Sequence, residues 1–181
     1  MHLLRRTLPL LCATGLLLPA APAAAGSACA GATAIPSSVS PQATTHVTLC
    51  LLNRERARHG LRALRENTRL QRAALRHSQD MVSSNLFSHS SSNGSDPAGR
   101  IRGAGYLSGA HSWTVGENIG WGQVSLASPA SMVRAWMHSP GHRANILRGA
   151  FRDIGIGVAS GTPVRGGAAG ATYTTDFGRR G

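Results

Sequence analysis

Lysine is absent from this sequence, and acidic residues are scarce. The 19 strongly basic residues are all arginines and face only seven Asp and Glu, so the formal net charge is +12. Eight arginines fall between Arg54 and Arg76, at intervals that place several on one helix face. A solvated helix face is the favoured interpretation; attraction to an anionic wall polymer, phospholipid headgroup or acidic substrate is the alternative. No aromatic residue lies among them to stack on bases, so nucleic acid is not an expected partner.

The sequence also lacks the usual signatures of hydrolytic enzymes. It has no G-x-S-x-G nucleophile turn and no H-E-x-x-H zinc motif. No cysteine is expected to remain as a free nucleophile in the exported protein. A serine hydrolase, a cysteine hydrolase or an H-E-x-x-H metalloprotease is therefore not predicted.

Only one long hydrophobic run occurs, at the start of the sequence. Arg5 and Arg6 precede the apolar run Leu8–Leu18, and Ala23-Ala24-Ala25 offers a cleavage site. We interpret residues 1–25 as a signal peptide; an uncleaved anchor is the alternative, and the general and twin-arginine export routes both stay open. No later segment is long and apolar enough to be predicted as a membrane span. The mature chain is therefore expected outside the cell, either free or retained at the wall.

The cysteine pattern fits export. Cys12 lies in the predicted signal peptide, which leaves Cys29 and Cys50 as an even pair in an oxidising compartment. We predict a disulfide between them, with two buried free thiols as the alternative. Residues 26–40 are rich in Ala, Gly, Ser and Pro and are predicted to form a flexible leader, and residues 41–181 a single domain.

Cap signals and hydrophobic periodicity divide the domain into helices followed by strands. Residue pairs typical of helix starts, such as Ser-Pro and Asp-Pro, precede most of the helical patterns. The predicted helical segments are 41–60, 67–85, 96–101 and 129–139, with a short helical turn after 139. The predicted strands are a hairpin at 154–158 and 173–177, and a strand at 113–115 that leads into GENIGWG. This order favours an α+β sandwich.

Glu117 and two histidines could carry chemistry. Glu117 lies among glycine, asparagine and apolar residues, so its carboxylate is expected to be partly desolvated and to need a cation, a metal or backbone N–H groups. A structural glutamate in a glycine turn is an equally open alternative. Because Pro140 and Gly141 separate His138 from His142, the two imidazoles need not share a face. His138 is interpreted as a helix-end cation, and His142 as free to face elsewhere.

One histidine and three glycines are assigned structural roles. His77 lies on the apolar stripe of its helix and is predicted to be a hydrogen-bonded core histidine. Gly141 is expected to serve close packing or an unusual backbone angle. The alternating Gly155 and Gly157 are expected to allow another element to pack closely against their strand.

Several sequence blocks together resemble one known family. The blocks LLNRERARHGLRAL, DMVSSNLFSHSS, GENIGWG, WMHSPGHRANIL and FRDIGIGVA with YTTDFG occur in the order typical of the CAP superfamily. That group comprises cysteine-rich secretory proteins, antigen 5 and pathogenesis-related-1 proteins, and this chain is similar to its short bacterial SCP-like extracellular branch. The resemblance covers roughly residues 42–178. It implies a three-layer α-β-α sandwich with a small antiparallel sheet and a central cleft.

The resemblance also implies a set of site residues. In the family the cleft holds two histidines and two glutamates, often with zinc. His89, Glu117 and His142 match three of these positions, whereas Ser139 stands where the other glutamate is usual. Ser139 and Asn118 are expected beside the ligand. Two imidazoles and one carboxylate still form the ligand set of an open zinc site, so weakly bound zinc is the expected cofactor.

Three functions are compatible with such a cleft. The first is a secreted binding module for a divalent metal or a small polar or lipid ligand. The second is a protease-like zinc hydrolase, in which Glu117 would be a ligand or the general base for a metal-activated water. The third is a structural wall-associated domain with a vestigial cleft. The expected partners are a small or lipid ligand or an anionic cell-envelope surface, and the expected state is a monomer.

Overall fold

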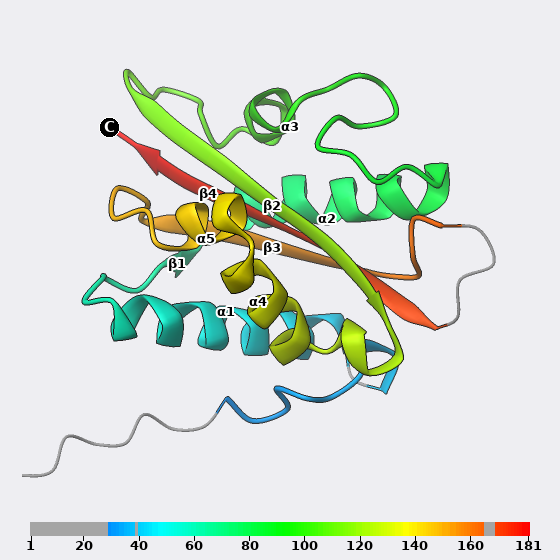
Figure 1. The fold of residues 1–181 in the computed structure, drawn as a ribbon. Coiled ribbons are helices and arrows are strands. Elements are labelled where there is room, and N and C mark those ends of the chain that lie inside the picture. The colour runs from blue at the N-terminus through cyan, green and yellow to red at the C-terminus, as the bar shows by residue number, and fades with distance from the viewer. Residues whose placement is uncertain (1–28, 39, 165–168) are drawn as a thin grey trace, which may run out of the picture.

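The chain folds into three layers, with a four-stranded sheet between two groups of helices (Figure 1). The computed structural model describes residues 29–38, 40–164 and 169–181, so the predicted signal peptide lies outside the described residues. The helices are α1 (Pro41–Arg58), α2 (Thr68–Ser84), α3 (Pro97–Gly103), α4 (Pro129–His138) and α5 (Pro140–Ile146), with 3-10 turns η1 (Pro36–Ser38) and η2 (Val124–Ala127). The strands are β1 (Arg65–Glu66), β2 (Trp113–Gln123), β3 (Asp153–Ser160) and β4 (Gly170–Arg180). The predicted α+β sandwich is confirmed.

Side-chain caps fix where the main helices begin. The side-chain oxygens of Ser40, Asn67, Asp96 and Ser128 each accept a hydrogen bond from a backbone N–H in the first helical turn that follows. Such bonds satisfy donors that have no partner inside the helix. The helix starts were therefore predictable from local sequence.

The sheet has the order β1-β3-β4-β2, which leaves β2 at one edge and β1 at the other. β4 pairs antiparallel with both β3 and β2, and this confirms the predicted hairpin. β1 adds a short parallel pairing with β3, an element that the sequence analysis did not anticipate.

The strand expected at 113–115 continues through GENIGWG as part of β2, so the alternative of a glycine turn there is wrong. Its glycines serve packing instead. A Cβ atom at Gly116 would lie 2.9 Å from the Phe151 ring, and one at Gly120 would collide with the side chain of Met132. The missing side chains let α4 and α5 approach the edge strand closely.

Two helix layers cover opposite faces of the sheet. α2 and α3 lie on one face; α1, α4 and α5 lie on the other (Figure 1). Gly155 and Gly157 in β3 face the backbone of α2 so closely that a Cβ atom would overlap it, as their alternation predicted. The larger core lies under α1, α4 and α5, where Trp136 meets Tyr173 edge to face and Phe151 stacks on Phe177.

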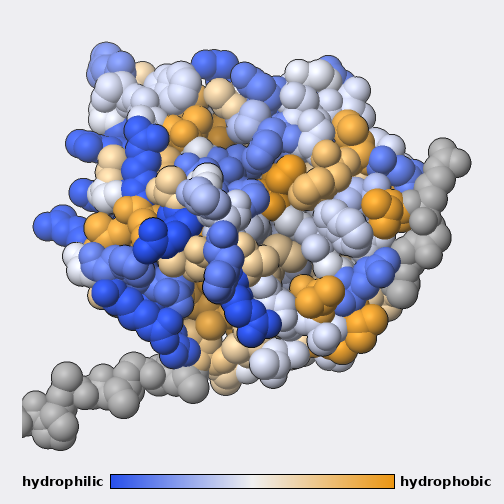
Figure 2. Space-filling model, in the orientation of Figure 1, coloured by the Kyte–Doolittle hydropathy of each residue, from blue (hydrophilic) through white to orange (hydrophobic). Residues whose placement is uncertain are grey.

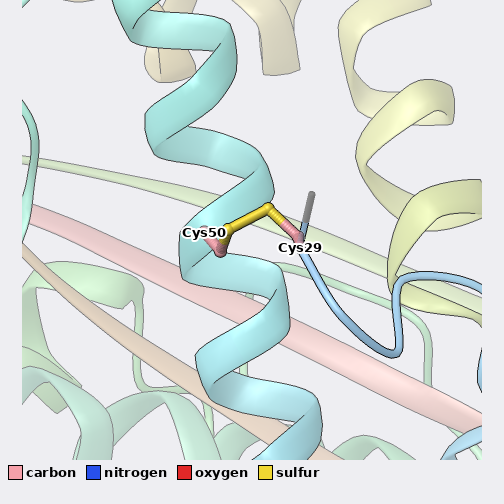
Figure 3. The surroundings of a disulfide bond; sticks show 2 residues. All are labelled: Cys29 and Cys50. Carbon is pink, nitrogen blue, oxygen red and sulfur yellow. A yellow bond between two sulfur atoms is a disulfide. The ribbon is translucent and has the colours of Figure 1, made fainter. Parts of the chain in front are cut away.

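A disulfide ties the leader to α1. Cys29 and Cys50 are bonded, with their Cα atoms 5.9 Å apart, and this confirms the predicted pair (Figure 3). Cys29 is buried, and the Ala32 carbonyl accepts a hydrogen bond from the Ala130 N–H at the start of α4. From Cys29 onward, the described part of the leader is thus held against the domain.

Most of the arginines between 54 and 76 are exposed, as expected for a solvated face. Arg56 is the exception, since it is fully buried. Its guanidinium donates to the backbone carbonyls of Arg62, Ile146 and Arg148.

None of the helices in the described ranges combines the length and apolar character that a membrane span needs.

Candidate functional site

The predicted site residues gather around the edge strand β2. Glu117 belongs to β2, His89 to the segment between α2 and α3, and His142 to α5. Asn85 ends α2 in a left-handed backbone conformation and turns the chain toward β2. Pro140 ends α4 and starts α5, which gives His142 a helix of its own.

Glu117 is held by two basic side chains. Its side chain is only 2% exposed, and its two oxygens have different partners. Oε1 accepts a hydrogen bond from His89 Nδ1 at 2.7 Å, and Oε2 accepts one from Arg100 Nη2. The desolvated carboxylate thus has a cation as its partner, one of the three kinds predicted.

Arg100 is the main addition that the structure makes to the site. Its side chain is 8% exposed, so the ion pair with Glu117 is nearly removed from water. Nη1 of the same guanidinium donates to the carbonyls of His89 and Ser95, each at 2.8 Å. Arg100 therefore fixes both the Glu117 carboxylate and the backbone that presents His89.

Two more titratable groups lie behind Glu117. Asp176, opposite Glu117 in the β2–β4 pairing, is fully buried. Burial, and then the negative charge of Glu117, raise the pKa of Asp176 well above its ordinary value. His77 is buried on α2; its Nε2 donates to the Ser88 carbonyl and its Nδ1 accepts from Ser91 Oγ. Burial lowers the pKa of His77, which confirms its prediction as a hydrogen-bonded core histidine.

Two amide side chains hold the backbone of His142 in place. Asn118 Nδ2 donates to the His142 carbonyl at 3.1 Å, and Asn145 Nδ2 donates to Asn118 Oδ1 at 2.9 Å. Asn118 is fully buried, so it supports the backbone of His142 and does not line the cleft. Burial and then the nearby charge of His89 lower the pKa of the His142 imidazole.

A cavity of about 410 Å³ runs along the edge of β2 beside His142. Its walls are mainly apolar and come from β2, η2, α4 and the segment after α2. Ser139 and His142 supply polar groups, and Phe87 and Leu126 are exposed apolar side chains of the same wall. The other lining residues are Ile119, Gly120, Trp121, Ser131, Met132, Ala135 and Trp136.

This arrangement does not fit a bound metal ion. Both oxygens of Glu117 already accept hydrogen bonds, and the Arg100 guanidinium brings a positive charge against the carboxylate. Across the described ranges, no group of three or more His, Cys, Asp or Glu side chains could hold a metal. Zinc binding by His89, Glu117 and His142 would require Glu117 to give up these contacts, and it stays an untested prediction.

The site and the fold match one protein family. The sequence pattern of CAP, described as the cysteine-rich secretory protein family, matches residues 49–175, which is more than half of the chain. The chain belongs to the CAP family. Among curated proteins it is similar to YkwD of Bacillus subtilis (strain 168), with 40% identity over 131 residues, covering 72% of this chain and 48% of YkwD. The membrane protein YlbC of the same organism is 34% identical over 110 residues, covering 61% of this chain and 30% of YlbC. This CAP chain thus spans less than half the length of these relatives.

Solved structures show the same CAP fold. An extracellular protein containing an SCP domain from Bacillus anthracis str. Ames superposes with a TM-score of 0.57 at 26% identity, covering 77% of this chain and 43% of that one. An outer surface protein of Borrelia burgdorferi gives a TM-score of 0.64 at 17% identity, covering 79% and 97% of the two chains. The second likeness shows the fold alone.

Glu117, His89 and His142 of this CAP chain were predicted from the sequence, whereas Arg100 and Asp176, which lie next to Glu117, were not. Arg100 is one of many arginines, and nothing local marks it as buried. Asp176 carried a usable signal, because a carboxylate within the alternating strand YTTDFG points inward if both faces of that strand are covered. Gly141 was wrongly assigned, since it lies in the first turn of α5, without a positive φ, and a Cβ atom there would meet nothing within 4 Å.

Proposed function

We propose that this CAP domain is an extracellular binding module that holds a small amphiphilic molecule in the cavity beside β2. The observation that carries the proposal is the cavity itself, with mainly apolar walls and a few polar groups, among them Ser139 and His142. A volume of about 410 Å³ lies in the range of small-molecule sites, which typically combine apolar walls with few polar groups.

The polar groups of the cavity are available to a ligand. Within the described part of the chain, neither the Ser139 hydroxyl nor the His142 imidazole forms a hydrogen bond. Because its pKa is lowered, the His142 imidazole is neutral at neutral pH, so it offers one donor and one acceptor. A ligand with a hydroxyl or carboxyl end and an apolar body would match this wall.

Secretion is part of the proposal and rests on separate support. The first 25 residues have the pattern of a signal peptide, and the disulfide requires an oxidising compartment to persist. The similar protein from Bacillus anthracis is described as extracellular. Retention at the cell wall is not part of this proposal.

A hydrolase is the weaker alternative for the same cleft. Glu117 is the candidate base, but both oxygens of its carboxylate are already engaged, one by His89 and the other by Arg100. No observation of the structure favours a hydrolytic step. The open cavity in turn supports a binding role over a purely structural wall domain.

Ligand titration with a matched pair of variants tests the proposal. Ala135 is an exposed wall residue of the cavity, and Ala57 is an exposed alanine on α1. We expect Ala135→Trp to fill the cavity and weaken binding of a fluorescent long-chain fatty acid about tenfold or more, and Ala57→Trp to leave it unchanged. Equal binding by both variants and wild type would show that the cavity is not the ligand site.

A further inference from the structure

A second cavity lies at the opposite edge of the sheet from the cleft. It has a volume of about 590 Å³ and is lined by Arg62, Ala63, Arg65, Arg152 and Asp153. We call it the arginine groove. It lies beside β1, whereas the cleft lies beside β2, and β1 and β2 are the two ends of the sheet. The groove is therefore separate from the proposed ligand cavity.

Backbone contacts hold the walls of the arginine groove in place. The Arg65 N–H donates to the Arg152 carbonyl at 2.9 Å where β1 meets β3. Arg56 Nε donates to the Arg62 carbonyl at 2.9 Å from inside the fold. Arg152 Nη1 donates to the Phe151 carbonyl, also at 2.9 Å. Two segments that are distant in sequence, 62–65 and 152–153, thus present their arginines at one place.

The groove has more positive than negative charge, because three arginines and one carboxylate, that of Asp153, line it. Over residues 29–38, 40–164 and 169–181, no carboxylate lies within ion-pair distance of Arg62, Arg65 or Arg152. The Asp153 carboxylate is engaged, since its Oδ2 accepts a hydrogen bond from the Tyr106 hydroxyl at 2.8 Å. Figure 2 shows strongly hydrophilic residues gathered on the side of the molecule where β1 and the end of α1 lie.

The buried arginine Arg56 contacts the backbone of the groove at the Arg62 carbonyl. The pKa of the Arg56 guanidinium is lowered by burial first and then by the positive charge of Arg152. Arg56 Nη2 is buried without a hydrogen-bond partner in the described structure. The two arginines thus repel each other, and an anion in the groove would relieve that repulsion.

We propose that the arginine groove binds a phosphate anion carried by a larger envelope molecule. Guanidinium groups bind phosphate oxygens through paired N–H donors, and arginine is suited to this contact beyond its charge. The phosphate could belong to a lipid headgroup or to a soluble phosphate polymer. The recognition chemistry is the same in both cases.

The test compares two variants that each remove two charges. Arg62→Gln/Arg65→Gln changes the groove, and Arg72→Gln/Arg179→Gln removes two exposed arginines that do not line it. All four side chains are exposed, so both variants are expected to fold, as circular dichroism would verify. Because both have the same net charge, general electrostatic attraction weakens equally in the two.

Two probes distinguish the sources of the phosphate. Binding to inorganic polyphosphate is measured by calorimetry, and binding to vesicles by sedimentation, with phosphatidylglycerol in phosphatidylcholine against phosphatidylcholine alone. We expect the groove variant to lose about tenfold in affinity for at least one phosphate probe at fixed salt, and the control to lose less than about threefold. A groove-specific loss of affinity for polyphosphate alone indicates that the phosphate belongs to a soluble polymer. A loss for vesicles alone indicates a lipid headgroup. A loss for both probes indicates that the groove recognises the phosphate chemistry that they share.

Two results would overturn the proposal. Equal losses in the groove and control variants would mean that net charge alone attracts anions. Unchanged binding in the groove variant would mean that the groove takes no part. A third variant, Arg62→Lys/Arg65→Lys, keeps the charge but removes the paired donors, and an intermediate loss is expected from it.

Discussion

The buried carboxylate Glu117 shows how a single residue organises the cleft. A desolvated charge is costly unless it is paired and hydrogen-bonded. Arg100 and His89 supply these contacts, and Arg100 also binds the backbone that carries His89. Arg100 supplies to the Glu117 carboxylate the positive charge that a bound metal ion would otherwise supply. The contacts of Arg100 and His89 thus hold the Glu117 carboxylate in place.

Asp176 gives a prediction for pH dependence. Its pKa is raised in the folded protein, so it keeps a proton at pH values where the unfolded chain has lost it. Stability from this group is present below the unfolded pKa of about 3.9 and is lost as pH rises toward the folded pKa. We expect Asp176→Asn to be more stable than wild type near pH 7, and the difference to shrink toward pH 4.

Thermal unfolding across this pH range provides the measurement. Each pH unit between the two pKa values changes the free energy of unfolding by about 1.4 kcal/mol. His77 and His142 have lowered pKa values and destabilise the fold below about pH 6.5, so only the difference between variant and wild type is informative. A constant difference at all pH values would contradict a protonated Asp176.

Zinc titration tests the metal prediction. We expect at most modest affinity, which weakens below about pH 6 because protonated imidazole cannot bind a metal. His89→Ala and His142→Ala should abolish any binding, and Ser139→Glu should tighten it by adding a carboxylate. Calorimetry of the four proteins decides the matter. Equal zinc binding by wild type and both alanine variants would show that the histidines are not ligands.

At the scale of elements, glycine has opposite roles in β3 and in α5. Gly157 faces the backbone of α2, where a Cβ atom would overlap Ala74 and Leu75. Gly141 lies in the open first turn of α5, with no positive φ and no close neighbour. The first glycine is required by helix–strand packing, and the second is only tolerated.

The two glycines provide a matched pair of substitutions. We expect Gly157→Ala to lower the free energy of unfolding by about 2 kcal/mol or more, because backbone must move to accept the methyl group. Gly141→Ala should be neutral or stabilise by about 0.5 kcal/mol, since alanine restricts the unfolded chain and favours helix. Chemical denaturation measures both. A larger loss from Gly141→Ala than from Gly157→Ala would reverse this assignment.

At the scale of the whole molecule, the two edges of the sheet have different character. The β2 edge carries the mainly apolar cavity, and the β1 edge carries the arginine groove. One chain could therefore hold a small amphiphile at one edge and contact an anionic envelope component at the other. The two sites share no lining residue, so each can be altered without the other.

The disulfide is expected to stabilise the whole fold. Cys29 and Cys50 are 21 residues apart, and closing a loop of this size contributes on the order of 3 kcal/mol. Cys29→Ala/Cys50→Ala should therefore unfold at lower denaturant concentration than wild type. A reductant should lower the stability of wild type to a similar value and leave the variant unchanged. A reductant effect on the variant would point to another cause.

Local signals in the sequence determined much of the fold. Ser40, Asn67, Asp96 and Ser128 cap helices because a side-chain oxygen can reach the first free N–H groups without help from distant residues. The alternation at 154–158 and 173–177 predicted the hairpin for the same reason, since a strand's period is a local property. The Cys29–Cys50 pair was predicted because these two cysteines remain once Cys12 is assigned to the predicted signal peptide.

The tertiary structure alone decided the rest, because it depends on contacts between distant segments. GENIGWG became an edge strand because β4 supplies its backbone partners and α4 and α5 need its glycines for close approach. Arg100 became the partner of Glu117, and Arg62, Arg65 and Arg152 came to share one groove, only when separate segments met. The sequence by itself determined which residues could carry charge or chemistry. Their partners were decided by folding, since burial and the position of neighbouring charges have no local signature.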